Sequence, residues 1–388
     1  MRKTELPALT GVRFYAAFLV FLSHVVILPG MEAMSEGRVL FNMGVVGVSF
    51  FFVLSGFILT YNYADAFNGG VSTTRYAHFL WDRLTKIYPV HLATLLLVAP
   101  IAVLSPNHPI IWGAVPFHLL LLQCFWPSTT PAYYDYLNNP SWSISCEWFF
   151  YLIAPMAIFG VLSSRRRRVL IIVAALAYAV VLGWVLWRAQ SDATRLHFVS
   201  WFAPSRFPEF LVGIFLGRFF LSRTNRGVKG TPFVQGVGIA LIITGALVRP
   251  NAPWPFWGGL LYVPGSTLLI WSLANGQGWF ANHLSRPWLN RLGVASFSLY
   301  LVHGPVLRYM KNFFNFFGWR IESWPVFVVT TVGAFIIVQT AALVLCYWYE
   351  LPTQRRLRRL LRPKDPAKAG PNIEVQEVPG GWTTYESR

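Results

Sequence analysis

The chain opens with a long apolar run that two ionisable residues interrupt. Residues 9–28 contain neither Pro nor Gly after Val12, and such a run forms a slightly short membrane-spanning helix. Within it stand Arg13 and His24, eleven residues apart. Eleven residues make about three helical turns, so both side chains lie on one face, roughly 16 Å apart along the axis. Because ionisable side chains are costly inside a membrane, the pair is a candidate functional site.

A structural role could explain each residue taken alone. The Arg13 side chain could extend to the cytosolic headgroups. His24 could be a neutral histidine that hydrogen bonds to a neighbouring helix. The shared face, and matching polar residues later in the chain, favour a functional role.

Composition places the whole chain in a membrane. Of the 388 residues, 55% are hydrophobic and only 12% are charged, a balance that soluble domains do not have. The first apolar run is followed by no cleavage site, so we expect it to be retained as a span. The three cysteines lack metal-ligand spacing and indicate neither a metal site nor a disulfide framework.

The net charge of +17 would suggest nucleic acid as a partner in a soluble protein. Here the basic residues lie in short loops and at the C-terminus, where they orient the chain and contact anionic lipid. We therefore expect membrane lipids, and not nucleic acid, as partners.

Ten apolar stretches predict an all-α, polytopic membrane protein. They are residues 12–28, 44–62, 87–104, 142–162, 169–187, 205–221, 234–248, 257–274, 293–310 and 325–349. A further stretch, 110–125, is short and bracketed by Pro109, Pro116 and Pro127. We expect it to be re-entrant or interfacial.

The distribution of Lys and Arg predicts the orientation. With the N-terminus in the cytosol, the cytosolic segments hold 23 of these residues and the outer segments hold 6, so both termini are expected in the cytosol. An eleventh span would place the run Arg165–Arg168 outside. We expect a membrane domain over 1–352 and a cytosolic tail over 353–388, basic at first and disordered beyond about Lys364.

This orientation places several polar residues in the outer third of the membrane. They are His24, Glu147 and the pair Arg206 and Glu209. A carboxylate that accepts a hydrogen bond from one imidazole nitrogen raises the basicity of the other, so Glu147 could make His24 a general base. The alternative is that these charges form ion pairs that tie helices together. Trp142 belongs to the same short motif as Glu147 and is a supporting candidate.

The cytosolic side is basic. Arg13, Arg83 and Lys86 lie at the inner ends of the first and third spans, where they could bind phosphates. They could equally be orienting residues without a ligand, which is the simpler interpretation for Lys86. His303, expected near the middle of the membrane, is a second functional candidate.

Small residues mark the second span. Gly47, Ser49, Ser55 and Gly56 would let another helix backbone, or a thin ligand, approach closely. Helix packing is the simpler interpretation, and Ser55 is the residue that we place on the donor side. A phosphate-binding end inside and a base outside, about three turns apart, would suit acyl-coenzyme A.

Several motifs resemble those of the acyltransferase-3 family of membrane O-acyltransferases. Beside the spacing of Arg13 and His24, they are residues 47–57 (GVSFFFVLSGF), 83–89 (RLTKIYP), 141–147 (SWSISCE), 206–210 (RFPEF) and 298–303 (SLYLVH). The resemblance runs from about residue 6 to residue 352. The family often has Arg where Lys86 stands, so a bidentate phosphate contact is not expected there.

The resemblance implies an enzyme of the bacterial cytoplasmic membrane. Cytosolic acyl-CoA, acetyl-CoA above all, would be the cosubstrate, with no permanently bound cofactor. The acceptor would be a sugar hydroxyl of an envelope polysaccharide, a lipopolysaccharide or a small glycoside such as a macrolide. His24 would act as general base or be briefly acylated itself. A glycan or lipid transporter with a proton relay is the rival from another class.

Overall fold

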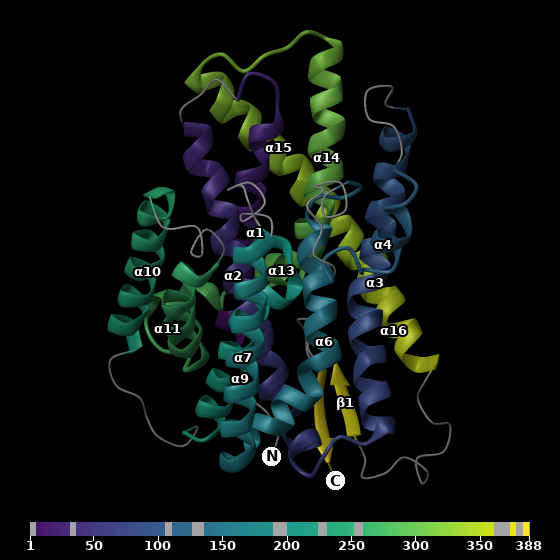
Figure 1. Cartoon of the computed structure of the whole chain (residues 1–388). Helices are drawn as coiled ribbons and strands as arrows, with labels where there is room; N and C mark the ends of the chain where they lie inside the picture. Colours follow the sequence, from purple (N-terminus) through teal and green to yellow (C-terminus); the bar gives the residue numbers. More distant parts are fainter. Residues whose placement is uncertain are drawn as a thin grey trace.

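A computed structural model of the chain describes residues 5–31, 36–104, 111–125, 136–188, 200–223, 231–251, 259–360, 373–377 and 383–387. The described chain is a bundle of long helices that stand side by side (Figure 1). Six of the described helices are long and apolar enough to cross a membrane. The chain is therefore a polytopic helical membrane protein, as its composition predicts.

A helix lies over each of the ten predicted ranges. The long helices are α1 (Pro7–His24), α2 (Glu36–Asn68), α3 (Thr73–Leu104), α6 (Ser141–Leu162), α7 (Ser164–Arg188), α9 (Ala203–Leu221), α10 (Thr231–Val248), α11 (Val263–Ala274), α14 (Ser296–Phe316) and α15 (Trp324–Val344). Shorter helices are α12 (Trp279–Leu284) and α13 (Pro287–Val294), with 3₁₀ turns at Val25–Ile27, Arg249–Asn251 and Leu260–Tyr262. Helices α2 and α3 begin before the predicted ranges because a helix can continue into polar residues beyond its apolar stretch.

Helix α1 has clear signals at both ends. Pro7 stands at its first position, where the missing backbone N–H is not needed. The helix ends at His24 and passes into the 3₁₀ turn. Gly30 then adopts a φ of 95°, a left-handed conformation that favours glycine. His24 is thereby the last residue of a helix that begins at the opposite end of the bundle.

Close helix packing explains the small residues of α2. A Cβ on Gly47 would lie 2.4 Å from the carbonyl oxygen of Ala16 in α1, and a Cβ on Gly56 would lie 2.1 Å from that of Phe210 in α9. Both distances are far below van der Waals contact, so only glycine fits. The packing interpretation is confirmed for these two positions, and it fixes α2 between α1 and α9.

The stretch at 111–125 contains one short helix, α4 (Val115–Leu119). Five residues cannot cross a membrane, so the described part of this stretch is not a further helical span. Cys124 is buried against α6, where its N–H donates to Ser145 Oγ (3.1 Å), and its carbonyl accepts from the N–H of Ala203 (2.9 Å). Residue 110 lies outside the described residues.

The C-terminal helix continues past the predicted boundary at residue 352. Helix α15 passes through a π-helical turn, Leu345–Glu350, into α16 (Leu351–Leu360). Pro352 directly follows the π-helical turn, where the regular pattern of backbone hydrogen bonds is already altered, and the helix continues through it. The basic α16 packs on α3, where Trp81 Nε1 donates to the carbonyl of Leu357 (3.1 Å) and Asp82 pairs with Arg358 (3.7 Å).

The described residues of the tail form two short strands. Strands β1 (Ile373–Glu377) and β2 (Thr383–Ser387) pair antiparallel, with Ile373 opposite Ser387. β-branched and aromatic residues, such as Val375 and Tyr385, favour strands even in a polar segment. Residues 361–372, 378–382 and 388 of the tail lie outside the described part. β1 lies at the same end of the bundle as the start of α1 (Figure 1).

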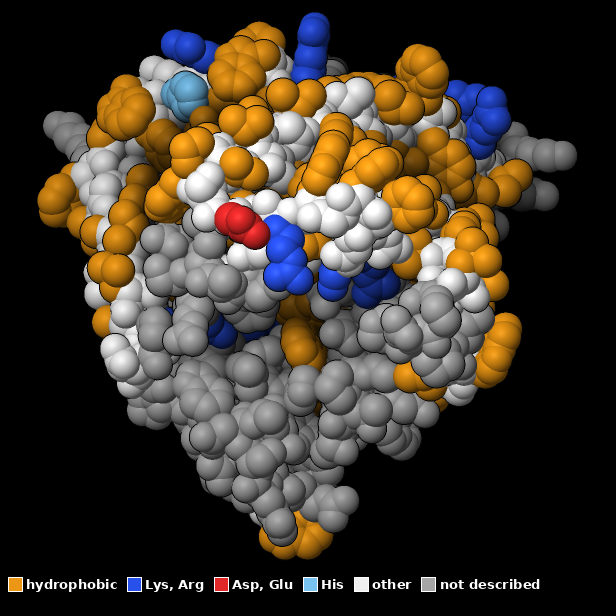
Figure 2. Space-filling view, turned by 90° about the horizontal axis from the view of Figure 1, so that it is seen from above, with side chains coloured by type: hydrophobic (Ala, Val, Ile, Leu, Met, Phe, Trp, Pro, Cys, Tyr) orange, Lys and Arg blue, Asp and Glu red, His pale blue; other side chains and the backbone are white. Residues whose placement is uncertain are grey.

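The opposite end of the bundle, seen from above in Figure 2, is mainly hydrophobic. Several of its visible basic side chains gather near the middle of the view, next to an acidic side chain, and others stand at the rim. Lys311, at this end of α14, is exposed.

Candidate active site

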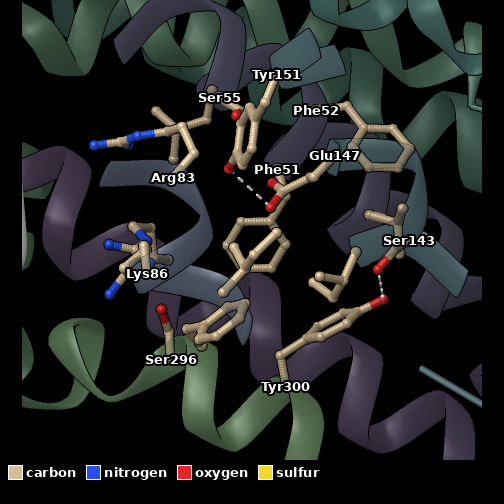
Figure 3. A pocket seen from close by; sticks show the side chains of 16 residues that line it. Phe51, Phe52, Ser55, Arg83, Lys86, Ser143, Glu147, Tyr151, Ser296 and Tyr300 are labelled. Atoms are coloured by element: carbon tan, nitrogen blue, oxygen red, sulfur yellow. Dashed lines mark hydrogen bonds between the residues drawn. The ribbon is translucent and has the colours of Figure 1, made fainter. Parts of the chain in front are cut away.

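A pocket of about 70 Å³ lies between α1, α2, α3, α6 and α14 (Figure 3). This volume holds several water molecules or a slender chain. Apolar side chains such as Phe51, Phe52 and Phe297 form much of its wall. Its polar lining residues are Arg13, Ser55, Arg83, Lys86, Ser143, Glu147, Tyr151, Ser296 and Tyr300. Five of the predicted site residues therefore share one cavity.

Three cations line this pocket. Arg13 and Arg83 are almost fully buried, with 7% and 4% of their surface exposed. Arg83 Nη2 donates to Tyr63 Oη (3.1 Å), and its guanidinium lies 5.5 Å from that ring. Lys86 instead forms an ion pair, because its Nζ lies 2.6 Å from Glu350 Oε1. Buried guanidinium groups of this kind suit phosphate or carboxylate ligands.

Glu147 faces these cations rather than His24. Its Oε2 accepts a hydrogen bond from Tyr151 Oη (3.1 Å), one turn along α6 (Figure 3). The expectation that Glu147 shares the outer site with His24 is therefore wrong. The residue lies two turns into α6, deep enough to line the basic pocket.

His24 lies outside the pocket and has other partners. Its Nδ1 donates to the carbonyl of Val20, one turn back in α1 (2.9 Å), and its Nε2 lies 3.2 Å from Asn139 Oδ1. A carboxamide therefore stands where a carboxylate was expected. Turning the carboxamide over exchanges its oxygen for its NH₂ group, so Asn139 can bond to Nε2 in either protonation state of the ring.

His303 is brought against His24. The centroids of the two imidazole rings lie 4.8 Å apart, and His303 is fully buried. The ring of Tyr300, one turn earlier in α14, lies 5.9 Å from His303. Tyr300 Oη lies 2.6 Å from Ser143 Oγ, and both residues line the pocket (Figure 3). Tyr300 therefore connects the pocket lining with His303, and His303 contacts His24, which does not itself line the pocket.

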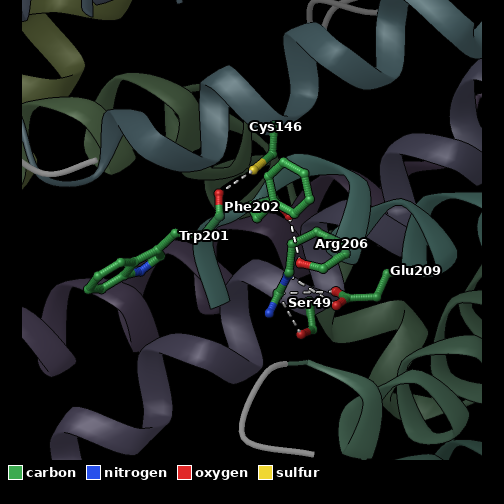
Figure 4. Close-up of polar contacts among 7 residues, drawn as sticks. Ser49, Cys146, Trp201, Phe202, Arg206 and Glu209 are labelled. Atoms are coloured by element: carbon green, nitrogen blue, oxygen red, sulfur yellow. Dashed lines mark hydrogen bonds and ion pairs between the residues drawn. The ribbon is translucent and has the colours of Figure 1, made fainter. Parts of the chain in front are cut away.

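Arg206 and Glu209 form a buried ion pair within α9 (Figure 4). Arg206 Nε lies 3.1 Å from Glu209 Oε1, and Arg206 Nη2 donates to Ser49 Oγ (3.3 Å) in α2. The guanidinium also lies 5.9 Å from the ring of Trp142. The ion pair itself lies within α9, and it is the hydrogen bond to Ser49 that ties α9 to α2. This geometry favours a structural role, because none of the four side chains lines the pocket.

Sequence reasoning missed Glu350, Asn139 and the contact of the two histidines. Glu350 stands in a π-helical turn, and its Oε2 also accepts from Ser298 Oγ (2.6 Å). Glu350 is a single acidic residue at the end of the last apolar stretch, and this position could have marked it as a candidate. Asn139 precedes the motif at 141–147 and gave no signal, since a polar residue before a helix is ordinary.

Comparison with known proteins decides the family. A family model described as an acyltransferase domain matches residues 6–343. The chain belongs to this acyltransferase-3 family. No solved structure matches the chain. The family assignment therefore rests on sequence, and the geometry above adds the arrangement of its polar residues.

The named relatives of this acyltransferase-3 protein are also acyltransferases by name. Acyltransferase MdmB of Streptomyces mycarofaciens is 31% identical over 97% of this chain and 98% of its own length. YrhL of Bacillus subtilis (strain 168), provisionally named a peptidoglycan O-acetyltransferase, is 23% identical over 78% of this chain and 48% of its own length. A provisionally named O-acetyltransferase of Staphylococcus aureus (strain COL) is 22% identical over 80% of this chain and 52% of its own length. This chain spans about half the length of the latter two. It is an O-acyltransferase.

Proposed function

We propose that this acyltransferase moves an acyl group, acetyl in the simplest case, from cytosolic acyl-CoA to a sugar hydroxyl on the outer side of a bacterial cytoplasmic membrane. The observation that carries the proposal is the pairing of a buried basic pocket with an imidazole farther along the same helix. Arg13 lines the pocket, and His24 ends α1 beyond it.

The orientation follows from the charge distribution. Ten spans with both termini in the cytosol place most Lys and Arg residues inside. The start of α1 then faces the cytosol, and His24 lies toward the outer surface. A cytosolic donor would meet Arg13 and Arg83 first, and an exported acceptor would meet His24 first.

The guanidinium groups of Arg13 and Arg83 would bind the phosphates of acyl-CoA. The pantetheine arm would extend along the pocket, whose wall is largely apolar. In the structure Tyr300 lines the pocket and its ring lies 5.9 Å from that of His303, whereas His24 does not line the pocket, so we expect the Tyr300 side chain to move before the thioester reaches His24. Lys86 would contribute little to this binding because Glu350 already balances its charge.

His24 Nε2 would take the proton of the acceptor hydroxyl. The hydroxyl oxygen attacks the thioester carbon, the C–S bond breaks, and the thiolate leaves as an ester forms. Asn139 would release Nε2 while this nitrogen takes the proton, and its carboxamide oxygen could then accept a hydrogen bond from the protonated Nε2. We propose this direct route over a covalent acyl-histidine, which rapid acid quench and mass spectrometry of the protein would detect.

The acceptor that we propose is a hydroxyl of an envelope or exported glycan. The provisional names of two relatives point to O-acetylation, one of them of peptidoglycan. The test is mass spectrometry of surface glycan from cells with and without the protein, beside cells that carry His24→Ala. A gain of one acyl mass only with the unaltered protein supports the proposal.

Two other results would redirect it. An acylated small glycoside in the medium, with unchanged glycan, would move the acceptor to that class. Translocation of a glycan or lipid without acyl transfer from acetyl-CoA by the purified protein would replace the enzyme with a transporter.

A further inference from the structure

The two histidines form one unit although 279 positions separate them in the chain. His24 comes from the end of α1 and is half-buried. His303 comes from α14 and is fully buried. Their ring centroids lie 4.8 Å apart with the ring planes inclined at 60°. Burying two imidazoles inside a membrane protein costs free energy that two apolar side chains would not cost. Such a pair therefore indicates a function.

Both rings carry the proton of the neutral form on the same nitrogen. The Nδ1 of His24 lies 2.9 Å from the carbonyl of Val20, and the Nδ1 of His303 lies 3.2 Å from the carbonyl of Leu299. A nitrogen that bonds to a carbonyl oxygen must be the donor, so each neutral ring has its lone pair on Nε2. Each helix therefore presents a basic Nε2.

The two Nε2 atoms differ in their surroundings. That of His24 bonds to Asn139. That of His303 is buried and has no hydrogen-bond partner among the described residues. A buried polar nitrogen without a partner is costly and usually awaits a ligand or a reacting group. The lone pair of His303 Nε2 is therefore available to accept a proton in the interior of the protein.

The segment at 136–140 holds this arrangement. Asn138 Nδ2 donates to the carbonyl of residue 301 (3.0 Å), and Arg308 Nη1 donates to the carbonyl of residue 137 (2.5 Å). These two bonds fix the segment to α14 on both sides of His303. Asn139, next in the chain, contacts His24. One segment thus sets the position of both imidazoles.

The position of His303 decides its part in the reaction. Its ring contacts His24 on one side and Tyr300, at the end of the donor pocket, on the other. An acceptor from outside reaches the half-buried His24 first, whereas a thioester that passes Tyr300 reaches His303. The acceptor thus meets His24 and the donor meets His303. One imidazole lies near the O–H bond that breaks, and the other lies near the C–S bond that breaks.

We propose that the two imidazoles divide the proton transfers: His24 takes the proton from the acceptor hydroxyl, and His303 gives a proton to the sulfur of the leaving thiolate. This inference rests on the proposed function. The hydroxyl loses its proton to His24, its oxygen forms the ester bond, and the C–S bond breaks. The proton then passes from His24 Nε2 to His303 Nε2, the ring of His303 turns toward the donor, and the same Nε2 gives the proton to sulfur, which leaves as a thiol. Acceptor and thioester become ester and thiol, and no further reactant is needed.

One proton suffices for the pair. Two positive charges at this separation in a poorly solvated interior would repel each other strongly, so the second imidazole stays neutral while the first is charged. The proton is therefore shared and moves between the rings. A single His24 would have to reach both the hydroxyl and the sulfur, which approach from opposite sides.

The test uses the full-length protein in detergent, acetyl-CoA as donor and the variant His303→Gln. We expect kcat to fall about 100-fold, the typical contribution of one general acid or base, with KM for acetyl-CoA nearly unchanged. The matched control is His91→Gln. His91 is also buried, donates from Nε2 to the carbonyl of His118 (2.8 Å) and has no partner at Nδ1 among the described residues. It should keep wild-type kcat.

A second donor separates proton delivery from a structural role. A 4-nitrothiophenyl thioester of acetate has a weakly basic leaving group that departs without a proton. With this donor His303→Gln should regain most of the wild-type rate, while His24→Ala should stay inactive. Recovered activity also shows that the variant is folded.

Three results would overturn the inference. They are an unchanged kcat for His303→Gln with acetyl-CoA, a loss confined to KM, and an equal loss with both donors. Absence of transfer by the unaltered protein from either donor would instead contradict the proposed function itself, so the two failures are distinguishable.

Discussion

The ion pair between Lys86 and Glu350 can be tested quantitatively. The two charged atoms lie 2.6 Å apart, and the side chains are 12% and 1% exposed. At an effective dielectric constant of 20 their attraction is about 6 kcal/mol, most of which offsets the cost of removing both charges from water. Removing one partner leaves the other buried and costs about 3–5 kcal/mol. Lys86→Met should therefore destabilise the protein by about that amount.

A second substitution, Glu350→Gln, tests whether the unpaired charge causes the loss of stability. In the double variant Lys86→Met with Glu350→Gln no unpaired charge remains, so most of the lost stability should return. Ser298, which donates to Glu350, can also donate to the amide oxygen. KM for acetyl-CoA should stay close to wild type, because Lys86 is engaged with Glu350 rather than with the donor.

The assay is the midpoint of thermal unfolding in detergent for the two single variants and the double variant. Lys311→Met is the control, since Lys311 is exposed, and its midpoint should not move. Refutation would come from a Lys86→Met protein as stable as wild type, or from a double variant no more stable than Lys86→Met. Either result would mean that the two residues are not energetically coupled. Lys86 would then again be a candidate for binding the donor phosphates.

Three further predictions concern the helices and the site. His24→Ala should abolish acyl transfer while the protein still accumulates in membranes; retained transfer would remove His24 from the mechanism. Arg13→Gln should raise KM for acetyl-CoA at least tenfold, because a buried charge-assisted contact contributes about 1.5–3 kcal/mol; an unchanged KM would place the phosphates elsewhere. Gly56→Leu should prevent accumulation of folded protein, because its Cβ would overlap α9, whereas Gly69→Leu should be tolerated, since nothing lies within 4 Å of that Cβ; equal yields would refute the packing.

Much of the fold could be predicted because hydropathy and helix periodicity are local. The ten apolar ranges each carry a helix, and the short stretch at 111–125 does not form a long one. Helix ends were less predictable. The last helix continues beyond residue 352 because a π-helical turn and a first-turn proline join two helices, and neither leaves a distinct pattern in sequence.

The site was predictable in part for the same reason. Spacing within one helix placed Arg13 and His24 correctly along α1, since a single helix fixes that geometry. Depth estimates across helices failed for Glu147, because a residue two turns into α6 can face a neighbouring helix at another level. The contacts of His24 with Asn139 and His303 depend on how α14 and the segment at 136–140 pack together, which spacing along the chain does not encode.

The central claim is that a donor held at Arg13 and Arg83 brings its acyl group beside His24, where the acceptor hydroxyl attacks it. The most direct measurement is an experimental structure of the protein with a non-hydrolysable acetyl-CoA analogue. We predict phosphates at the two arginines, a rotated Tyr300 and the acyl carbon beside the two imidazoles, within reach of an acceptor oxygen bonded to His24 Nε2. An analogue whose acyl end stays beside Glu147, with the Tyr300 side chain in its present position, would contradict the account.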